Sequence, residues 1–217
     1  MDRTIKGTIA VIVTAVILLF VAYGSYLPMR KAQIFIATLQ SFQTKPVTSL
    51  QDLENRLSVP LDYPSPIGQE ELVRNTANSV LGFLQHGTDA TTTAVFMGFL
   101  NGYYKPILDR GKGMSFGQDL YLEGAMNEIA FSQTGGANYL QDALKYYSLG
   151  HEQGPNRPQP LYGLFDVYRA MGDVVDAKAT AAEILANWPS DTRVADSMAQ
   201  FMSPTKTSSV PSSAKTP

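Results

Sequence analysis

Apolar residues follow two different patterns along this chain. From Gly7 to Leu27 they form a continuous run that contains no charged residue. After that run they recur at intervals of three and four residues, which is the spacing of an amphipathic helix. No segment alternates polar and apolar residues for long enough to indicate a strand. The pattern predicts an all-α protein of antiparallel helix pairs that follow one very apolar N-terminal helix.

The apolar run is long enough to cross a membrane. Its 21 residues reach about 30 Å as a helix, the thickness of a hydrocarbon core. We expect residues 1–27 to form an uncleaved transmembrane anchor that ends at Pro28. A cleaved signal peptide is the alternative, because Ala22 and Gly24 match a small-x-small cleavage pattern before Ser25.

The charges that flank the run give little information about orientation. Arg3 and Lys6 precede it and Arg30 and Lys31 follow it, so the positive-inside rule nearly cancels. We call the part of the chain after the apolar run the body. A short N-terminal tail followed by an apolar run and a large acidic body favours an orientation with the body on the extracytoplasmic side.

Residues 28–117 are predicted to form further helices, either degenerate repeats or a separate helical region. Ser49 and Asp52 indicate a capped helix start. Three prolines place residues 59–68 in a loop. The expected helices include one that begins at Pro28 and others over residues 69–85, 90–110 and 118–132.

The C-terminal part of the chain carries a repeat of 34 residues. Ala143 lies twelve residues before Pro155, and Ala177 lies twelve residues before Pro189. This is the period of the tetratricopeptide unit, a pair of antiparallel helices. Residues 124–202 therefore resemble tetratricopeptide repeats, and we expect a repeat domain with a capping helix over residues 118–202. The resemblance implies an α-solenoid of helical hairpins whose apolar faces are buried by stacking.

The repeat over residues 158–191 matches this family best. It departs from the family at Phe165, where a glycine is usual, and at Ala181, where an aromatic residue is usual. The preceding repeat is predicted to carry a long loop over residues 133–138. A helix over residues 191–202 resembles the capping helix of such solenoids, and the Ser/Thr/Pro-rich tail, residues 203–217, is predicted to be disordered.

Tetratricopeptide proteins bind a protein or peptide in a concave groove lined by the first helix of each repeat. Carried over to this chain, the resemblance implies a groove lined by Gln159, Tyr162, Asp166 and Arg169. Their spacing of 3, 4 and 3 residues places them on one helix face, opposite the apolar stripe. An ordinary solvated helix face is the alternative interpretation.

A second resemblance involves shorter stretches. Residues 26–31, 61–71 and 154–159 are similar to the last membrane helix and helical tail of bacterial O-antigen ligase or polymerase-like proteins. Those enzymes perform their chemistry among many membrane helices, whereas this chain carries one such segment. The resemblance implies a single-pass protein of the bacterial inner membrane that is a non-catalytic accessory of envelope glycan polymerisation or ligation.

Candidate chemistry is sparse in this sequence. The chain contains no cysteine, which excludes disulfides and thiolate sites. Beyond residue 31 it carries 13 basic and 18 acidic residues, which argues against a nucleic-acid partner. His86 and His151 lie outside metal-binding spacings. We therefore expect no catalytic residue, no metal and no cofactor.

Two weaker motifs have ordinary explanations. Residues 111–113 hint at a phosphate loop but lack the required upstream glycine and strand. The pairs Tyr103–Tyr104 and Tyr146–Tyr147 are expected to place one ring in the core and the other half exposed, where it could stack on a sugar or peptide.

Together these patterns favour a membrane-anchored adaptor or scaffold that binds a protein or peptide in an envelope complex. The rivals are a glycan-assembly accessory or enzyme subunit, and a structural helper that acts through the helices between Pro28 and Arg110.

Overall fold

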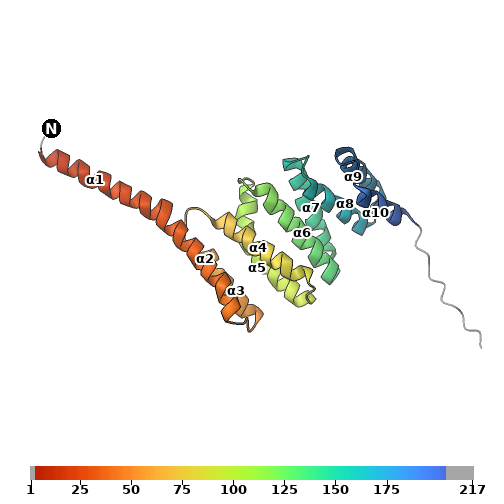
Figure 1. Ribbon diagram of the computed structural model, residues 1–217, viewed down its shortest axis with the longest axis horizontal. Coiled ribbons are helices and arrows are strands. Elements are labelled where there is room, and N and C mark those ends of the chain that lie inside the picture. Colours follow the sequence, from red (N-terminus) through yellow and green to blue (C-terminus); the bar gives the residue numbers. More distant parts are fainter. Residues whose placement is uncertain (1–2, 204–217) are drawn as a thin grey trace, which may run out of the picture.

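The computed structural model describes residues 3–203, and within this range the protein is helical and contains no strand (Figure 1). The predicted all-α class is therefore confirmed. The elements are α1 (Arg3–Val21), the π-helical segment η1 (Ala22–Tyr26), α2 (Leu27–Thr44), α3 (Leu50–Asp62), α4 (Gln69–Gln85), α5 (Ala90–Arg110), α6 (Phe116–Thr134), α7 (Ala137–Gln153), α8 (Pro158–Met171), α9 (Val174–Asn187) and α10 (Thr192–Met202).

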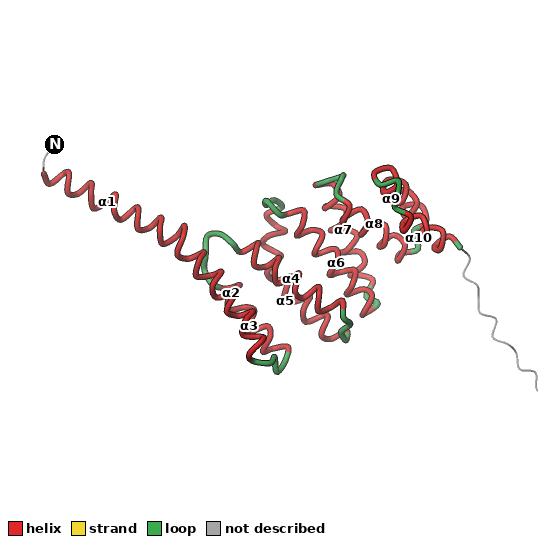
Figure 2. The backbone as a smooth tube through the Cα atoms, viewed as in Figure 1, coloured by secondary structure: helices red, strands yellow, loops and turns green. Residues whose placement is uncertain are grey.

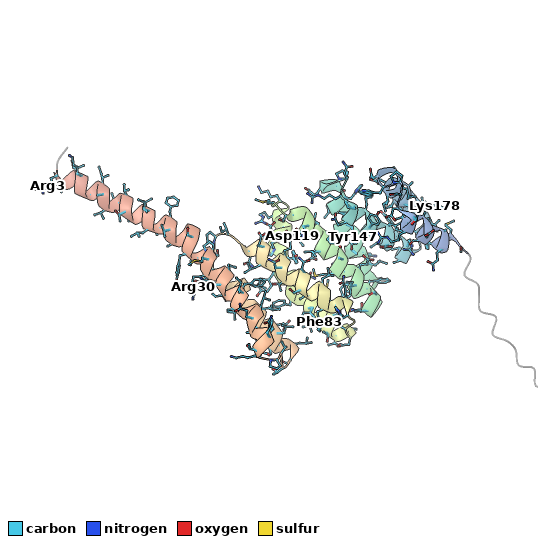
Figure 3. All side chains as sticks on the ribbon, viewed as in Figure 1. Arg3, Arg30, Phe83, Asp119, Tyr147 and Lys178 are labelled. Carbon is cyan, nitrogen blue, oxygen red and sulfur yellow. The ribbon has the colours of Figure 1, made fainter. Side chains whose placement is uncertain are left out.

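The helix α1 projects away from the rest of the molecule (Figure 1). None of its residues is buried, although most of them are apolar. Within residues 3–203, it belongs to the one helix that is long and apolar enough to cross a membrane, judged by length and composition. Figure 3 shows its side chains extending freely along the segment between Arg3 and Arg30.

The prediction that the apolar helix ends at Pro28 is wrong. The helix runs without a break from Arg3 to Thr44. Proline lacks an N–H donor, and its ring clashes with the carbonyl of the residue four positions earlier. The π-helical turn η1 widens the helix just before the proline, and the Leu27 N–H donates to the Ala22 carbonyl oxygen. The chain thereby accommodates Pro28 inside a continuous helix.

The loop predicted over residues 59–68 begins later than expected, because α3 continues to Asp62 with Pro60 inside it. The buried side chains of Leu57 and Leu61 hold this last turn against the neighbouring helices. Lys31 of α2 completes the helix end: its ammonium donates to the carbonyl oxygens of Leu61 at 3.2 Å and Tyr63 at 2.7 Å. A lysine at a helix C-terminus stabilises carbonyls that lack an intrahelical partner.

Consecutive helices of the body pack against each other, and α4 also packs closely against α6 (Figures 1 and 2). The largest apolar cluster contains residues of α2, α3, α4, α5 and α6. Two smaller clusters follow, one of α7 and α8 residues and one of α8, α9 and α10 residues. The helix α6 also contacts α8, which is two elements further along the chain. Side chains with no exposed surface in these clusters include Leu84, Leu100, Tyr104, Met126, Val167 and Ile184.

The loop predicted over residues 133–138 is also wrong. The helix α6 ends at Thr134 and α7 begins at Ala137, so only two glycines connect them. Gly135 adopts a left-handed conformation with φ of 69°, and its N–H donates to the Phe131 carbonyl oxygen at 2.7 Å. A glycine in this conformation ends a helix within one residue, which makes the α6–α7 hairpin tight.

Tyr147 sets the spacing of α6, α7 and α8. Its buried ring lies against Gly124 of α6 and Gly163 of α8, and a Cβ atom at either glycine would overlap the ring. The two departures from the family pattern, Phe165 and Ala181, belong to one buried cluster. The large side chain therefore comes from α8 and the small one from α9.

The tail predicted to be disordered lies outside the described residues, except for Ser203. That residue ends α10, and its N–H donates to the carbonyl oxygens of Ala199 and Gln200, each at 3.1 Å.

Candidate functional site: a groove between α6, α8 and α10

Three of the four predicted groove residues line one hollow of about 410 Å³. Gln159 and Asp166 of α8 are exposed, and Tyr162 is half-buried. The fourth residue, Arg169, lies outside this lining: it is half-buried, pairs with Asp166 at 2.9 Å, and its guanidinium lies 5.2 Å from the centre of the Phe165 ring. The other lining residues are Tyr121, Glu128, Tyr147, Pro158, Gly163 and Arg193.

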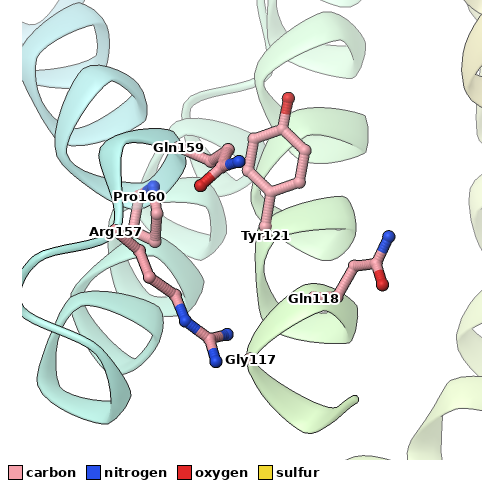
Figure 4. A pocket seen from close by; sticks show the side chains of 6 residues that line it. All are labelled: Gly117, Gln118, Tyr121, Arg157, Gln159 and Pro160. Atoms are coloured by element: carbon pink, nitrogen blue, oxygen red, sulfur yellow. The ribbon is translucent and has the colours of Figure 1, made fainter.

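A second hollow, of about 390 Å³, adjoins the first. Figure 4 shows it between the N-terminal ends of α6 and α8, where the Arg157 side chain extends toward Gly117. Tyr121 and Gln159 line both hollows, so the two form one surface feature, which we call the α6–α8 groove. The remaining residues of the second hollow are Gln118 and Pro160.

The helices that form the groove run in the same direction. Arg157, which precedes α8, lies beside Gly117 at the start of α6. Glu128, near the other end of α6, lines the same hollow as Asp166 of α8. This arrangement arises because α7 returns the chain between two helices that lie side by side. A groove between parallel helices can accommodate an elongated ligand along its length.

Tyrosine rings form rigid parts of the groove wall. Tyr121 and Tyr147 have their ring centres 6.2 Å apart, and Tyr162 lies 6.0 Å from the Trp188 ring. The Tyr162 hydroxyl donates to the Asp191 carboxylate, which also accepts hydrogen bonds from the first turn of α10. This hydrogen bond raises the pKa of Tyr162 and lowers that of Asp191. Fixed aromatic walls suit binding because little side-chain freedom is lost.

Both charge signs are present in the groove. Glu128 is half-buried, and its Oε2 accepts a hydrogen bond from the Tyr147 hydroxyl at 2.9 Å. Burial raises the pKa of Glu128, and this hydrogen bond opposes the rise. Arg193 of α10 lies 5.0 Å from the centre of the Tyr162 ring. The groove therefore offers charged, amide and aromatic contacts together.

Sequence reasoning did not identify Tyr121, Glu128, Arg157 or Arg193 as groove residues. When helical hairpins stack, the first helix of each hairpin lies on the same wall. Aligning α6 with α8 would therefore have identified Tyr121 and Glu128 as groove residues. Nothing in the sequence indicated that Arg157 lines the groove, because its position depends on how the turn before α8 folds. Arg193 lies in the helix that the sequence identified only as a cap.

A separate cluster of polar side chains is enclosed between α4, α5 and α6. Asp119 and Glu123 have no exposed surface, and the Asp119 Oδ1 lies 3.8 Å from the Arg74 Nη1 (Figure 3 labels Asp119). Burial is the main cause that raises the pKa of Asp119 to about 7 and that of Glu123 to about 8. Such groups resemble acid–base catalysts in their pKa. Because both are closed to solvent, no substrate reaches them in this conformation.

The other motifs take ordinary positions in the structure. The His86 Nδ1 lies 2.7 Å from the Gly82 carbonyl oxygen, and the His151 Nε2 lies 3.3 Å from Glu183. Residues 3–203 contain no group of three metal-ligating side chains. The loop at Gly113 faces the Glu70 carboxylate, which disfavours phosphate there.

The tyrosine pairs divide as the sequence predicts. Tyr104 and Tyr147 are buried, and Tyr103 and Tyr146 are half-exposed.

Comparison of the chain with protein-family models, curated protein sequences and solved structures gave no match. Function is therefore argued from the groove. An open groove with mixed charge and aromatic walls can bind an elongated ligand.

Proposed function

We propose that the protein is a membrane-anchored adaptor and that the α6–α8 groove binds a segment of a protein partner. The observation that carries this proposal is the continuity of the groove: two hollows share Tyr121 and Gln159 and receive residues from α6, α8 and α10. A continuous channel along parallel helices fits an extended peptide better than a compact small molecule, which usually occupies an enclosed apolar pocket.

The order of the helices supports a tetratricopeptide-like solenoid as part of this proposal. The pairs α6–α7 and α8–α9 are consecutive packed hairpins, and α10 packs on α9. In such a solenoid the first helix of each hairpin faces the concave side. Here α6 and α8 supply most of the groove lining, and α10 adds Arg193.

The apolar helix supports the other half of the proposal. If α1 crosses a membrane, the groove is held close to it and meets membrane-bound partners at a high effective concentration, so modest affinity is sufficient. We place the protein in the bacterial inner membrane, with a single pass and the body on the extracytoplasmic side, as part of an envelope complex.

Site-specific photo-crosslinking tests this function. A photo-reactive benzoylphenylalanine replaces Gln159, which is exposed in the groove, and the full-length protein is irradiated in its native membrane. We expect a discrete crosslinked product that contains one partner protein, identified by mass spectrometry. Adding Tyr121→Ala should reduce this product severalfold, because the ring lines both hollows.

The matched control carries the photo-reactive residue at Lys178, which is exposed on α9 outside the groove lining (Figure 3). This control should give no product of the same mass. Equal crosslinking from both positions, or a groove product unaffected by Tyr121→Ala, would reject the groove as the binding site. Recovery of lipid-linked sugar at Gln159 in place of a protein would favour the glycan-accessory alternative.

A further inference from the structure

The charged residues of the α6–α8 groove differ in whether they already have a partner. Asp166 pairs with Arg169 at 2.9 Å, and Arg193 lies 3.9 Å from Asp191. Across residues 3–203, neither Arg157 nor Glu128 has an oppositely charged group within 4.0 Å. One positive and one negative group in the groove are thus left without an ionic partner.

The Arg157 side chain is exposed and lies close to the backbone at two glycines. A Cβ atom on Gly154 would lie 2.8 Å from the Arg157 Cδ, and one on Gly117 would lie 2.5 Å from its Nη1. The side chain therefore passes close to two glycines and reaches the start of α6 (Figure 4). Its planar guanidinium presents paired donors that match the two oxygen atoms of a carboxylate.

Glu128 lies near the opposite end of the groove and is positioned by a hydrogen bond. The Tyr147 hydroxyl holds its Oε2 at 2.9 Å, and the Tyr147 ring is itself fixed between Gly124 and Gly163. The carboxylate is half-buried and lines the hollow. A partly desolvated charge without a counter-ion is unfavourable, so a ligand cation at this point is stabilising.

The separation of Arg157 and Glu128 sets the spacing of the two complementary charges in the ligand. Arg157 reaches the level of Gly117, and Glu128 lies eleven residues further along α6. Eleven residues of helix rise about 16 Å, which an extended peptide covers in about five residues.

We infer that the α6–α8 groove binds an extended peptide segment with an acidic and a basic side chain about five residues apart. The acidic side chain contacts Arg157 and the basic one contacts Glu128, while Tyr121 supports the backbone between them. This inference rests on the proposed function and specifies the chemistry of the partner segment.

The test uses the full-length protein in lipid nanodiscs and four fluorescein-labelled synthetic peptides. The first carries a glutamate and a lysine five positions apart in a Gly/Ser/Thr background. The others replace the glutamate with glutamine, the lysine with glutamine, or both. Fluorescence anisotropy gives the dissociation constants. We expect the doubly charged peptide to bind about tenfold more tightly than either singly charged peptide at low salt.

Charge reversal shows which residue contacts which charge. Arg157→Glu should weaken the glutamate–lysine peptide about tenfold and strengthen a peptide in which both charged positions are lysine. Glu128→Lys should also weaken the glutamate–lysine peptide, and it should strengthen a peptide in which both charged positions are glutamate. Lys178→Glu is the control, because it makes a charge change of the same size outside the groove lining and should leave all affinities unchanged.

Equal affinity for all four peptides, or reversal variants that respond as Lys178→Glu does, would overturn this inference. Neither result affects the photo-crosslinking test, which captures the native partner whatever its charge. A crosslinked partner combined with charge-independent peptide binding would retain the adaptor function and reject the charge assignment.

Discussion

Asp119 and Glu123 are carboxylic acids enclosed in a helical interior, and their oxygen atoms have no hydrogen-bond partner among the residues of the structure. The hydroxyl of Tyr104 and the Nη1 of Arg74 in the same region share this property. Arg74 supplies a positive charge 3.8 Å from Asp119 but also pairs with Glu71. Burial of a carboxylate favours its protonated form. These residues therefore make the stability of the protein sensitive to pH.

The pH dependence has a definite sign. The folded protein holds protons on Asp119 and Glu123 up to pH values near 7 and 8, whereas the unfolded chain releases them near pH 4. Between these limits the folded state binds more protons, so the free energy of unfolding decreases as pH rises from about 4 to about 8. Glu123→Gln should flatten this decline, as measured by urea unfolding in detergent micelles at several pH values.

Glu152→Gln, which changes an exposed carboxylate on α7, is the matched control and should retain the wild-type pH dependence. A Glu123→Gln variant whose stability declines as steeply as that of the wild type would show that the buried carboxyl does not control the pH response.

At the scale of helices, close packing at glycine determines how α6, α7 and α8 fit together. Tyr147 of α7 occupies the space that side chains at Gly124 of α6 and Gly163 of α8 would need. One ring therefore spaces three helices and also holds Glu128 in the groove. The geometry of the groove depends on this contact.

Gly163→Ala tests the contact. The added methyl group would overlap the Tyr147 ring, so we expect a loss of about 1–3 kcal/mol in the free energy of unfolding. Gly102→Ala is the matched control, because no atom lies within 4 Å of the added Cβ and alanine favours a helix by about 0.5–1 kcal/mol. If both variants gain stability, the ring is free to move and does not set the helix spacing.

The helix α2 both extends the apolar helix and connects it to the rest of the molecule. Its N-terminal end continues the apolar helix, and Lys31 joins it to the end of α3 and the start of α4 through Leu61, Tyr63 and Gln69. Lys31 is thus used in packing, which leaves Arg30 as the exposed basic residue at that end of the apolar run.

For the whole molecule, the apolar helix and the body are structurally separable. No residue of α1 is buried, and its main contact is with η1 in the same continuous helix. Burial of apolar surface is the main source of folding stability. The body should therefore not depend on α1 for its fold.

Deletion of residues 1–21, which removes α1, tests this separation. The melting temperature of the body, followed by circular dichroism, should match that of the full-length protein in detergent within about 2 °C, because the deleted residues bury no core side chain. The shortened protein should also leave the membrane fraction. A large fall in melting temperature would show that α1 packs on the body.

The sequence predicted the local elements well. The helices over residues 69–85 and 90–110 have the predicted bounds, and the Ser49 hydroxyl accepts a hydrogen bond from the Asp52 N–H at its helix start. These features depend on residues three or four positions apart, which a reading of the chain can compare directly. The apolar N-terminal helix follows from length and composition in the same way.

The tertiary structure decided which residues from distant parts of the chain lie next to each other. It brought Arg157 to Gly117, aligned Glu128 with Asp166 and enclosed Asp119 and Glu123. It also carried the helix through Pro28 and shortened the α6–α7 connection. The physical reason is that periodicity specifies which face of a helix is apolar, whereas packing between residues that are distant in the chain specifies which faces meet. The groove exists only after α6 and α8 have packed side by side.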